Sequence, residues 1–106
     1  MDEQRRPLAA LTTQVQKVSD LYAARFGINR DTLWHLSKMT EELGEVHAAF
    51  LNASGRGRER EGDDSDLGAE LADLLAFVLL FARAEGIDLD AALERKWLTH
   101  LADNTN

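Results

Sequence analysis

Residues 71–82, LADLLAFVLLFA, form the most apolar segment of the chain and contain one charged residue, Asp73. A helix that is apolar on all sides has to be covered on all sides. The other helices of a chain of 106 residues can hardly surround such a helix. We therefore expect a homodimer or a larger homo-oligomer, in which a second subunit covers part of this segment. The alternative is a monomeric four-helix bundle with one exposed apolar flank.

Helical periodicity extends through most of the chain. Strand-like alternation is missing, and the segments between the glycines are rich in Ala, Leu, Glu and Arg, with apolar residues at helical spacing. The pattern predicts four helices, at residues 8–26, 31–53, 67–85 and from 89 onward, the last with the apolar stripe Leu89, Leu93, Trp97 and Leu101. We expect Gly27 and Gly86 to end the first and third helices, and Asp31 (or Asn29) and Asp88 to cap the second and fourth. The predicted fold class is all-α, a four-helix protomer that assembles into a dimeric or tetrameric helical bundle.

Composition narrows the class of protein. The length fits a single domain over residues 1–106, with flexible tails at 1–7 and 103–106 and a charged loop at 54–66 that carries Arg56, Arg58 and Arg60. The net charge of −7 argues against sequence-independent nucleic-acid binding, and the lack of cysteine excludes disulfides and thiolate metal sites. The longest apolar run, residues 74–82, is far shorter than the ~20 residues that span a bilayer, and the first residues show no signal-peptide pattern. We expect a cytoplasmic protein that binds no membrane and forms no stable complex with nucleic acid.

Asp73 raises the question of what pairs with it. A carboxylate inside an apolar segment is costly unless a partner neutralises it. Glu70 lies three residues earlier, and the segment EELGE gives Glu42 and Glu45 the same spacing, so that each pair projects from one side of its helix. If the second and third helices pack antiparallel, these four carboxylates converge. Hard oxygen ligands of this kind favour Mg²⁺ or Mn²⁺.

A structural interpretation of the same residues stays open. The spacing E-x-x-E is common on solvated helix faces, where a lysine such as Lys38 pairs with Glu42 four residues later. Asp73 can instead be neutralised by an arginine or lie at the exposed start of its helix. Glu41, opposite the apolar stripe of its helix, faces water most easily. The two carboxylate pairs together favour a metal site.

These motifs resemble a known family. EELGE at residues 41–45, followed after 24 residues by ELAD, resembles the E-E-x-x-E…E-x-x-D signature of the all-α nucleoside triphosphate pyrophosphohydrolases. This MazG-like superfamily includes dimeric dUTPases and phosphoribosyl-ATP pyrophosphohydrolases. The segments KMTEELGEVHAAFL and AELADLLAFVLLFARAEGIDLDAALERKW agree with its pattern, so that the resemblance covers roughly residues 30–98.

The resemblance implies a metal-dependent enzyme. It places Mg²⁺, for which Mn²⁺ can substitute, on Glu42, Glu45, Glu70 and Asp73, with Glu41 as a further candidate. Members cleave a nucleoside triphosphate between the α and β phosphorus atoms, giving the monophosphate and pyrophosphate. They are typically dimers or tetramers and often act as house-cleaning enzymes of the nucleotide pool. We expect Glu42 or Glu45 to accept the proton of the attacking water.

Three other residues are candidates for substrate binding. Lys38, one turn before Glu42, and Lys96, where family members often carry a lysine, are expected to contact the phosphates. Trp34 is a candidate for stacking on a base, whereas Trp97 is expected in the core. After Lys96, the sequence WLTHLADN lacks the basic, asparagine-containing run of many relatives.

Two further functions stay open beside the generic triphosphate pyrophosphohydrolase. A phosphoribosyl-ATP pyrophosphohydrolase of histidine synthesis shares the metal carboxylates and differs in its pocket contacts. A non-catalytic helical dimerisation or regulatory protein uses its apolar helix only for assembly. The intact set of four carboxylates favours an enzyme, because a scaffold has no need to keep them together.

Overall fold

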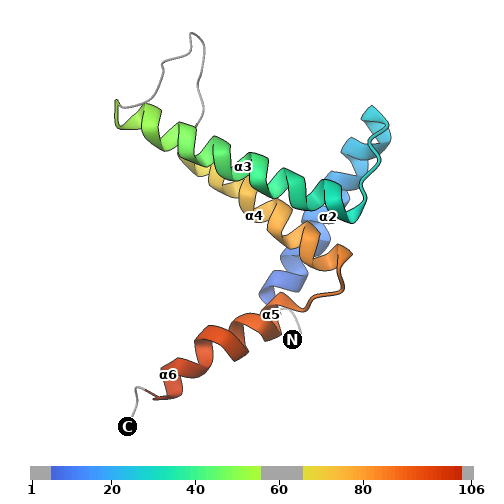
Figure 1. Cartoon of the computed structure of the whole chain (residues 1–106). Helices are drawn as coiled ribbons and strands as arrows, with labels where there is room; N and C mark the ends of the chain where they lie inside the picture. The colour runs from blue at the N-terminus through green and yellow to red at the C-terminus, as the bar shows by residue number, and fades with distance from the viewer. Residues whose placement is uncertain (1–5, 56–65, 104–106) are drawn as a thin grey trace. The chain divides into compact units, whose positions relative to one another are not determined.

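Figure 1 shows the computed structural model of the chain, which describes residues 6–55 and 66–103. Three long helices come first: α2 (Pro7–Phe26), α3 (Thr32–Ala53) and α4 (Leu67–Ala84). The fourth helical stretch consists of α5 (Leu89–Leu93), the π-helical turn η1 (Glu94–Leu98) and α6 (Thr99–Asp103). Within the described ranges there is no strand, and no helix there is long and apolar enough to cross a membrane. The predicted all-α, four-helix fold class is therefore confirmed.

The chain divides into two compact units. The central unit, Asn29–Val78, contains α3 and the first part of α4. The terminal unit, Met1–Ile28 with Leu79–Asn106, contains α2, the end of α4 and the fourth helical stretch. The single domain over residues 1–106 stays a prediction. Most of the predicted charged loop at 54–66, with its three arginines Arg56, Arg58 and Arg60, lies outside the described residues, as do most of the predicted tails.

The predicted helix ends are confirmed where the structure describes them. Gly27 and Gly86 follow α2 and α4 with φ of 64° and 69°, in the left-handed region where a residue without Cβ is least strained. The Asp31 carboxylate accepts a hydrogen bond from the backbone N–H of Trp34 at 2.8 Å and so caps α3. Asp88 caps α5 in the same way. These caps fix where the site-bearing helix α3 begins.

A contact between distant parts of the sequence holds the terminal unit together. The two carboxylate oxygens of Asp90 accept hydrogen bonds from the backbone N–H groups of Leu8 and Ala9, at 2.9 and 3.0 Å. These N–H groups belong to the first turn of α2, where no partner within the helix is available. Arg6 also pairs with Asp88. The sequence pattern did not predict this contact, because the residues lie more than 80 positions apart.

The fourth helical stretch differs from the expected helix. Trp97 and Leu101 were expected on a buried stripe, but their side chains are 67% and 66% exposed in the described chain. The prediction of Trp97 in the core is therefore wrong for the chain by itself. Leu93, which precedes the π-helical turn Glu94–Leu98, is also 41% exposed, so the described residues leave most of this apolar stripe uncovered on both sides of the turn.

A buried histidine lies at the start of α3. His35 is only 6% exposed, and neither ring nitrogen has a hydrogen-bond partner among the described residues. Burial lowers the pKa of His35 below its usual 6.5, because it disfavours the charged ring. The ring edge meets Trp34, with the centroids 5.2 Å apart. His35 is therefore a neutral, unsatisfied polar group in the core.

We predict that His35→Leu stabilises the protein by about 1 kcal/mol at pH 7.5, because it removes buried polar atoms that lack partners. The unfolded chain binds a proton on this histidine at a higher pH than the folded chain. The free energy of unfolding of the wild type should therefore fall as the pH drops below 6.5. Denaturant unfolding at both pH values should show that the free energy of unfolding falls less between pH 7.5 and 5.5 for His35→Leu than for the wild type. His47→Leu, at an exposed position on the same helix, is the control; equal pH dependence in His35→Leu and wild type would contradict the assignment.

Candidate metal centre

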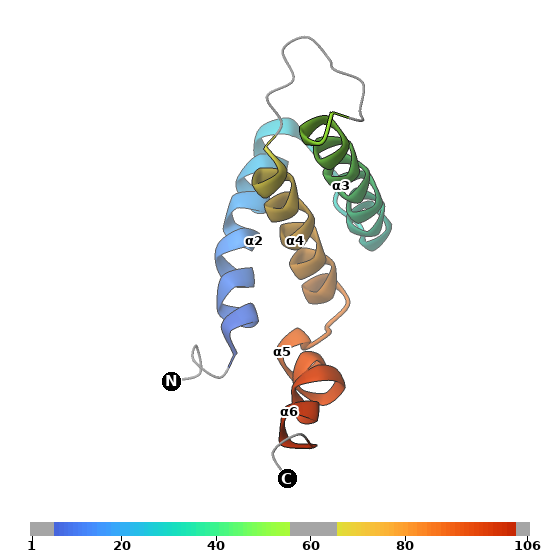
Figure 2. The ribbon, with the colours of Figure 1, turned by 90° about the vertical axis from the view of Figure 1, so that its left-hand side faces the viewer.

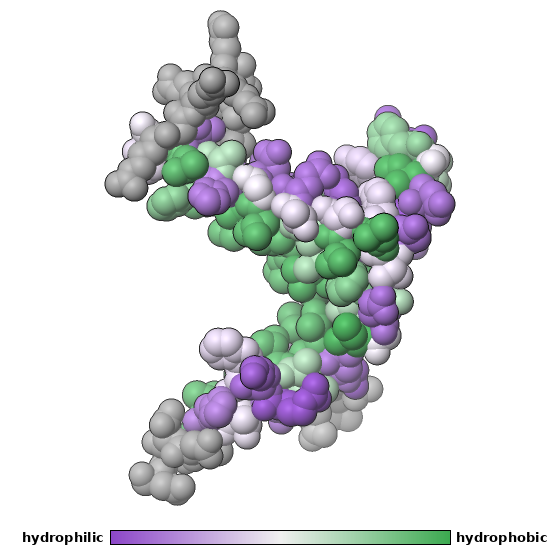
Figure 3. Space-filling view, viewed as in Figure 1, coloured by the Kyte–Doolittle hydropathy of each residue, from purple (hydrophilic) through white to green (hydrophobic). Residues whose placement is uncertain are grey.

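The site lies within the central unit, between α3 and the first part of α4. Both views of the ribbon show these two segments side by side and running in opposite directions (Figures 1 and 2). This is the antiparallel packing on which the expected convergence of carboxylates depended. Apolar side chains gather along one edge of α3 and α4, and hydrophilic ones along another (Figure 3).

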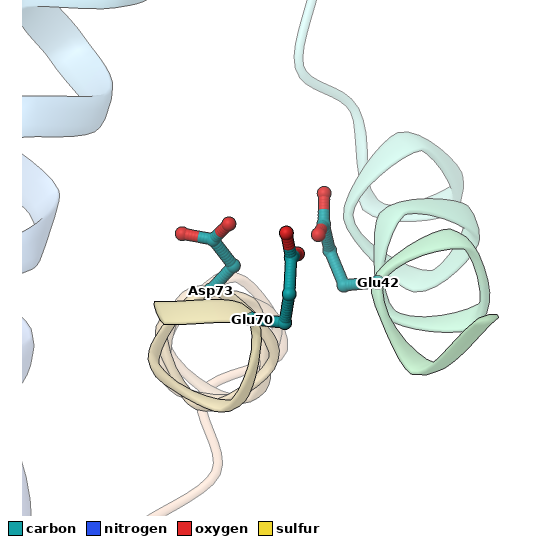
Figure 4. Close-up of side chains that lie close together, drawn as sticks. All are labelled: Glu42, Glu70 and Asp73. Carbon is teal, nitrogen blue, oxygen red and sulfur yellow. The ribbon is translucent and has the colours of Figure 1, made fainter. Parts of the chain in front are cut away.

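Three carboxylates meet between the two helices. Glu42, Glu70 and Asp73 each offer an oxygen atom, and these oxygens lie within 4.8 Å of one another. Glu70 and Asp73 project from neighbouring positions of α4, and Glu42 reaches toward them from α3, with all three carboxylates on the same side (Figure 4). The three-residue spacing on α4 places its two carboxylates together. We call Glu42, Glu70 and Asp73 the carboxylate group.

Within the carboxylate group, the side chain of Glu42 is only 12% exposed. Burial raises the pKa of Glu42, and the charges of Asp73, Glu41 and Glu70 raise it further. The Lys38 ammonium acts in the opposite direction and lowers the pKa. Glu42 therefore lies where a negative charge is costly and a nearby cation is favourable.

Asp73 is not buried in the chain by itself. Its side chain is exposed, as are those of its neighbours Leu71 and Leu75, at 49% and 46%. The sequence left open whether Asp73 is buried or exposed, and in the chain by itself it is exposed. Leu71 and Leu75 lie on a different side of α4 from Asp73, because two residues along an α-helix correspond to a rotation of about 200°. The apolar segment itself is only partly covered within the described residues.

The other two glutamates of EELGE lie outside the carboxylate group. Glu45 is exposed one turn further along α3, and the structure does not bring it together with the other three carboxylates. Glu41 is also exposed, and its Oε2 accepts a hydrogen bond from the Lys38 Nζ at 3.1 Å. Lys38 Nζ lies 3.8 Å from Glu42 Oε1 as well. The sequence prediction of four converging carboxylates is thus met for three of the four.

An aromatic pair extends the site toward the start of α3. The rings of Trp34 and Phe77 meet edge to face, with centroids 5.8 Å apart. Antiparallel packing explains this contact: Trp34 lies eight residues before Glu42 on α3, and Phe77 lies seven residues after Glu70 on α4. The sequence interpretation missed Phe77. Its position four residues after Asp73, on the same helix face, was the signal that could have indicated it.

Lys96 lies elsewhere in the chain. It belongs to η1, in the terminal unit, and its side chain is exposed.

The terminal unit also contains a pocket of about 280 Å³, lined by residues of α2, the end of α4 and the segment that leads into α5. None of the carboxylate group lines this pocket. The carboxylate group of the central unit is therefore the stronger candidate site.

Comparison with known families agrees with these motifs. A family model described as phosphoribosyl-ATP pyrophosphohydrolase matches residues 12–95, which include α3, α4 and the whole carboxylate group. The chain belongs to the phosphoribosyl-ATP pyrophosphohydrolase family. This membership indicates a pyrophosphohydrolase and confirms the wider superfamily to which the sequence motifs pointed. Searches of curated proteins and of solved structures found no match.

The titration of Glu42 provides a direct test of the site's electrostatics. We predict that Asp73→Asn lowers the pKa of Glu42 in metal-free protein, because it removes a neighbouring negative charge, whereas Lys38→Met raises it. The measurement is a carboxyl-carbon NMR titration of Glu42. Glu45→Gln is the matched control, because Glu45 is not among the charges that shift Glu42. A pKa that stays the same in Asp73→Asn would show that the two carboxylates do not interact.

Proposed function

We propose that the protein hydrolyses the anhydride between the α and β phosphates of phosphoribosyl-ATP, giving phosphoribosyl-AMP and pyrophosphate. The match of the family model to residues 12–95 carries this proposal, because it covers both carboxylate motifs and names this substrate. A generic nucleoside triphosphate has the same anhydride. The carboxylate group alone therefore supports the reaction class, and the family match favours phosphoribosyl-ATP within it.

We assign Glu42, Glu70 and Asp73 as ligands of Mg²⁺ or Mn²⁺. Carboxylate oxygens are the hard ligands that these ions prefer. Ligand atoms around an octahedral Mg²⁺ lie about 3 to 4 Å apart, and the three oxygens lie within 4.8 Å, so that small side-chain rotations make the set fit. When bound, the metal neutralises charge on the phosphates and lowers the pKa of a water ligand. The raised pKa of Glu42 is consistent with this assignment, because burial and then the charge of Asp73 disfavour its ionised form, which a bound cation would favour.

Glu45 receives a separate role in this proposal. It lies one turn from Glu42 on α3 but outside the carboxylate group, and its side chain is exposed. An exposed carboxylate close to the metal ligands is suited to accept a proton from the attacking water. The water oxygen then bonds to phosphorus as the bond from that phosphorus to the bridging oxygen breaks. Glu42 remains the alternative acceptor if Glu45 proves dispensable.

Substrate contacts follow from the row of residues beside the carboxylate group. Lys38, whose ammonium lies 3.8 Å from a Glu42 oxygen, is the cation best placed to meet a phosphate. Trp34 lies one turn before Lys38, so that a base stacked on its ring lies on the side of Lys38 away from the carboxylates. Lys96 is proposed as a second phosphate contact on the basis of the family pattern alone.

The assembly state is part of the proposal. Leu71 and Leu75, four residues apart on the most apolar helix of the chain, are about half exposed. Contact of these leucines with water is unfavourable, and a second copy of the chain that covers them removes this contact. We therefore propose a homodimer or homotetramer. No stable nucleic-acid complex is expected from a chain with a net charge of −7.

A substrate panel tests the reaction. We predict pyrophosphate release from phosphoribosyl-ATP with Mg²⁺ or Mn²⁺, none with EDTA, and slower release from ATP and from canonical, deoxy or damaged nucleoside triphosphates. Release that is faster from one of those triphosphates would move the substrate to the nucleotide pool and keep the reaction class. Folded, metal-supplied protein that releases pyrophosphate from no member of the panel would contradict the pyrophosphohydrolase and favour a regulatory protein.

Variants measured in the same assay distinguish the metal ligands from the proton acceptor. Glu42→Gln and Asp73→Asn should each lower kcat/KM by about 100-fold or more. They should also abolish the rise in melting temperature that Mg²⁺ causes in the wild type, since a ligand of the folded state stabilises it. Glu45→Gln should lower kcat and keep the Mg²⁺-dependent rise. Glu85→Gln, at an exposed position just after α4, is the control.

A further inference from the structure

Lys38 is held between two acidic residues of its own helix. Its Nζ donates a hydrogen bond to Glu41 Oε2 at 3.1 Å and lies 3.8 Å from Glu42 Oε1. Of these two carboxylates, Glu42 belongs to the carboxylate group and Glu41 does not. The ammonium therefore bridges the group and an acidic residue outside it.

Two aromatic rings complete the surroundings of the ammonium. Lys38 Nζ lies 5.9 Å from the ring centroid of Trp34 and 5.5 Å from that of Phe77. These distances allow cation–π attraction, which is stronger where water is partly excluded. The Lys38 side chain is only 25% exposed. The ammonium thus has favourable partners on α3 and α4 that do not depend on Glu42.

The structure assigns Lys38 as a built-in counter-cation that competes with a divalent metal ion for Glu42. Glu41 is the positioning residue that holds Lys38 when the metal ion binds Glu42. This inference rests on the proposed metal site. It goes beyond that site because it gives a role to Glu41 and predicts that Lys38 weakens the binding of the metal ion. Lys38 supplies one positive charge to a group of three carboxylates, so that a divalent ion can replace it at Glu42 with a net gain in attraction.

The same contacts explain why Lys38 stays at the site after it leaves Glu42. Glu41 Oε2 is already its nearer partner, at 3.1 Å. Trp34 precedes Lys38 by four residues on α3, whereas Glu42 follows it by four, and the ring of Phe77 packs against that of Trp34. A lysine held in this way keeps a fixed charge beside the carboxylate group, where the proposed function needs a contact to a phosphate.

Metal binding without substrate tests this inference. The probe is Mn²⁺, and its dissociation constant is measured by titration calorimetry for the wild type, Lys38→Met, Glu41→Gln and the double variant. Lys38→Met should bind Mn²⁺ about three- to tenfold more tightly, because the competitor is gone and Met keeps the apolar contact with the rings. Glu41→Gln should bind it about threefold more weakly, because Lys38 then pairs with Glu42 alone. In the Lys38→Met background, Glu41→Gln should have no effect.

The double variant separates the positioning role from a general effect of charge. If Glu41 acts on the metal only through its own negative charge, Glu41→Gln weakens Mn²⁺ binding equally in both backgrounds, and the inference is overturned. An unchanged affinity in Lys38→Met overturns it as well. Lys17→Met, which removes one positive charge from an exposed position on α2, controls for net charge and should leave the affinity unchanged.

Failure of this inference is distinguishable from failure of the proposed function. Additive effects in the four proteins, together with metal-dependent pyrophosphate release, would overturn the roles of Lys38 and Glu41 and leave the enzyme intact. If the wild type binds no Mn²⁺ at all, both the competition between Lys38 and the metal ion and the proposed metal site are contradicted. Dissociation constants and turnover are measured separately, so that each result has one interpretation.

Discussion

Repulsion among carboxylates from two antiparallel helices is the constraint on which the central unit depends. Glu42 is nearly buried, and its neighbours on α4 place two further carboxylates within 4.8 Å of its own oxygens. Charges this close repel one another, and the repulsion opposes the packing of the helices unless a cation offsets it. Lys38 supplies part of that positive charge in the chain itself. A bound divalent ion would supply more.

The order of residues along the two helices links this constraint to function. On α3, Trp34, Lys38 and Glu42 follow one another at intervals of four residues, and so form a row on one face. On α4, Asp73 and Phe77 have the same interval. Because the helices run in opposite directions, carboxylates meet carboxylates and the two aromatic rings meet each other. The row is therefore acidic at one end and aromatic at the other. This arrangement suits a substrate whose phosphates lie near the carboxylates and whose base lies near the aromatic rings.

Local features of the sequence predicted the helices well. The caps at Asp31 and Asp88 and the stop at Gly27 each depend on a few neighbouring residues, and all three are present in the structure. The convergence of Glu42 with the carboxylates of α4 was also predictable, because the three-residue spacing fixes the helix face.

Long-range features were not predictable from the same patterns. The Asp90 cap of α2 joins residues far apart in the chain, and no local motif signals it. The sequence did not decide whether Asp73 is exposed, because hydrophobicity alone does not give burial, and the described chain leaves part of its most apolar helix uncovered. The exposure of Trp97 was not predictable, because helical periodicity identifies an apolar stripe but not what covers it, and Leu93 of the same stripe is exposed too. The separation of Glu45 from the other carboxylates depends on how the two helices pack, which a helical wheel does not contain.

The most direct test of the central claim is a crystal structure with Mn²⁺ and its anomalous scattering. An anomalous peak bonded to oxygens of Glu42, Glu70 and Asp73 is the result that this account predicts. Lys38 should then contact Glu41 and no longer approach Glu42. A peak that is coordinated elsewhere, with these three carboxylates unchanged, would contradict the assignment of the metal centre.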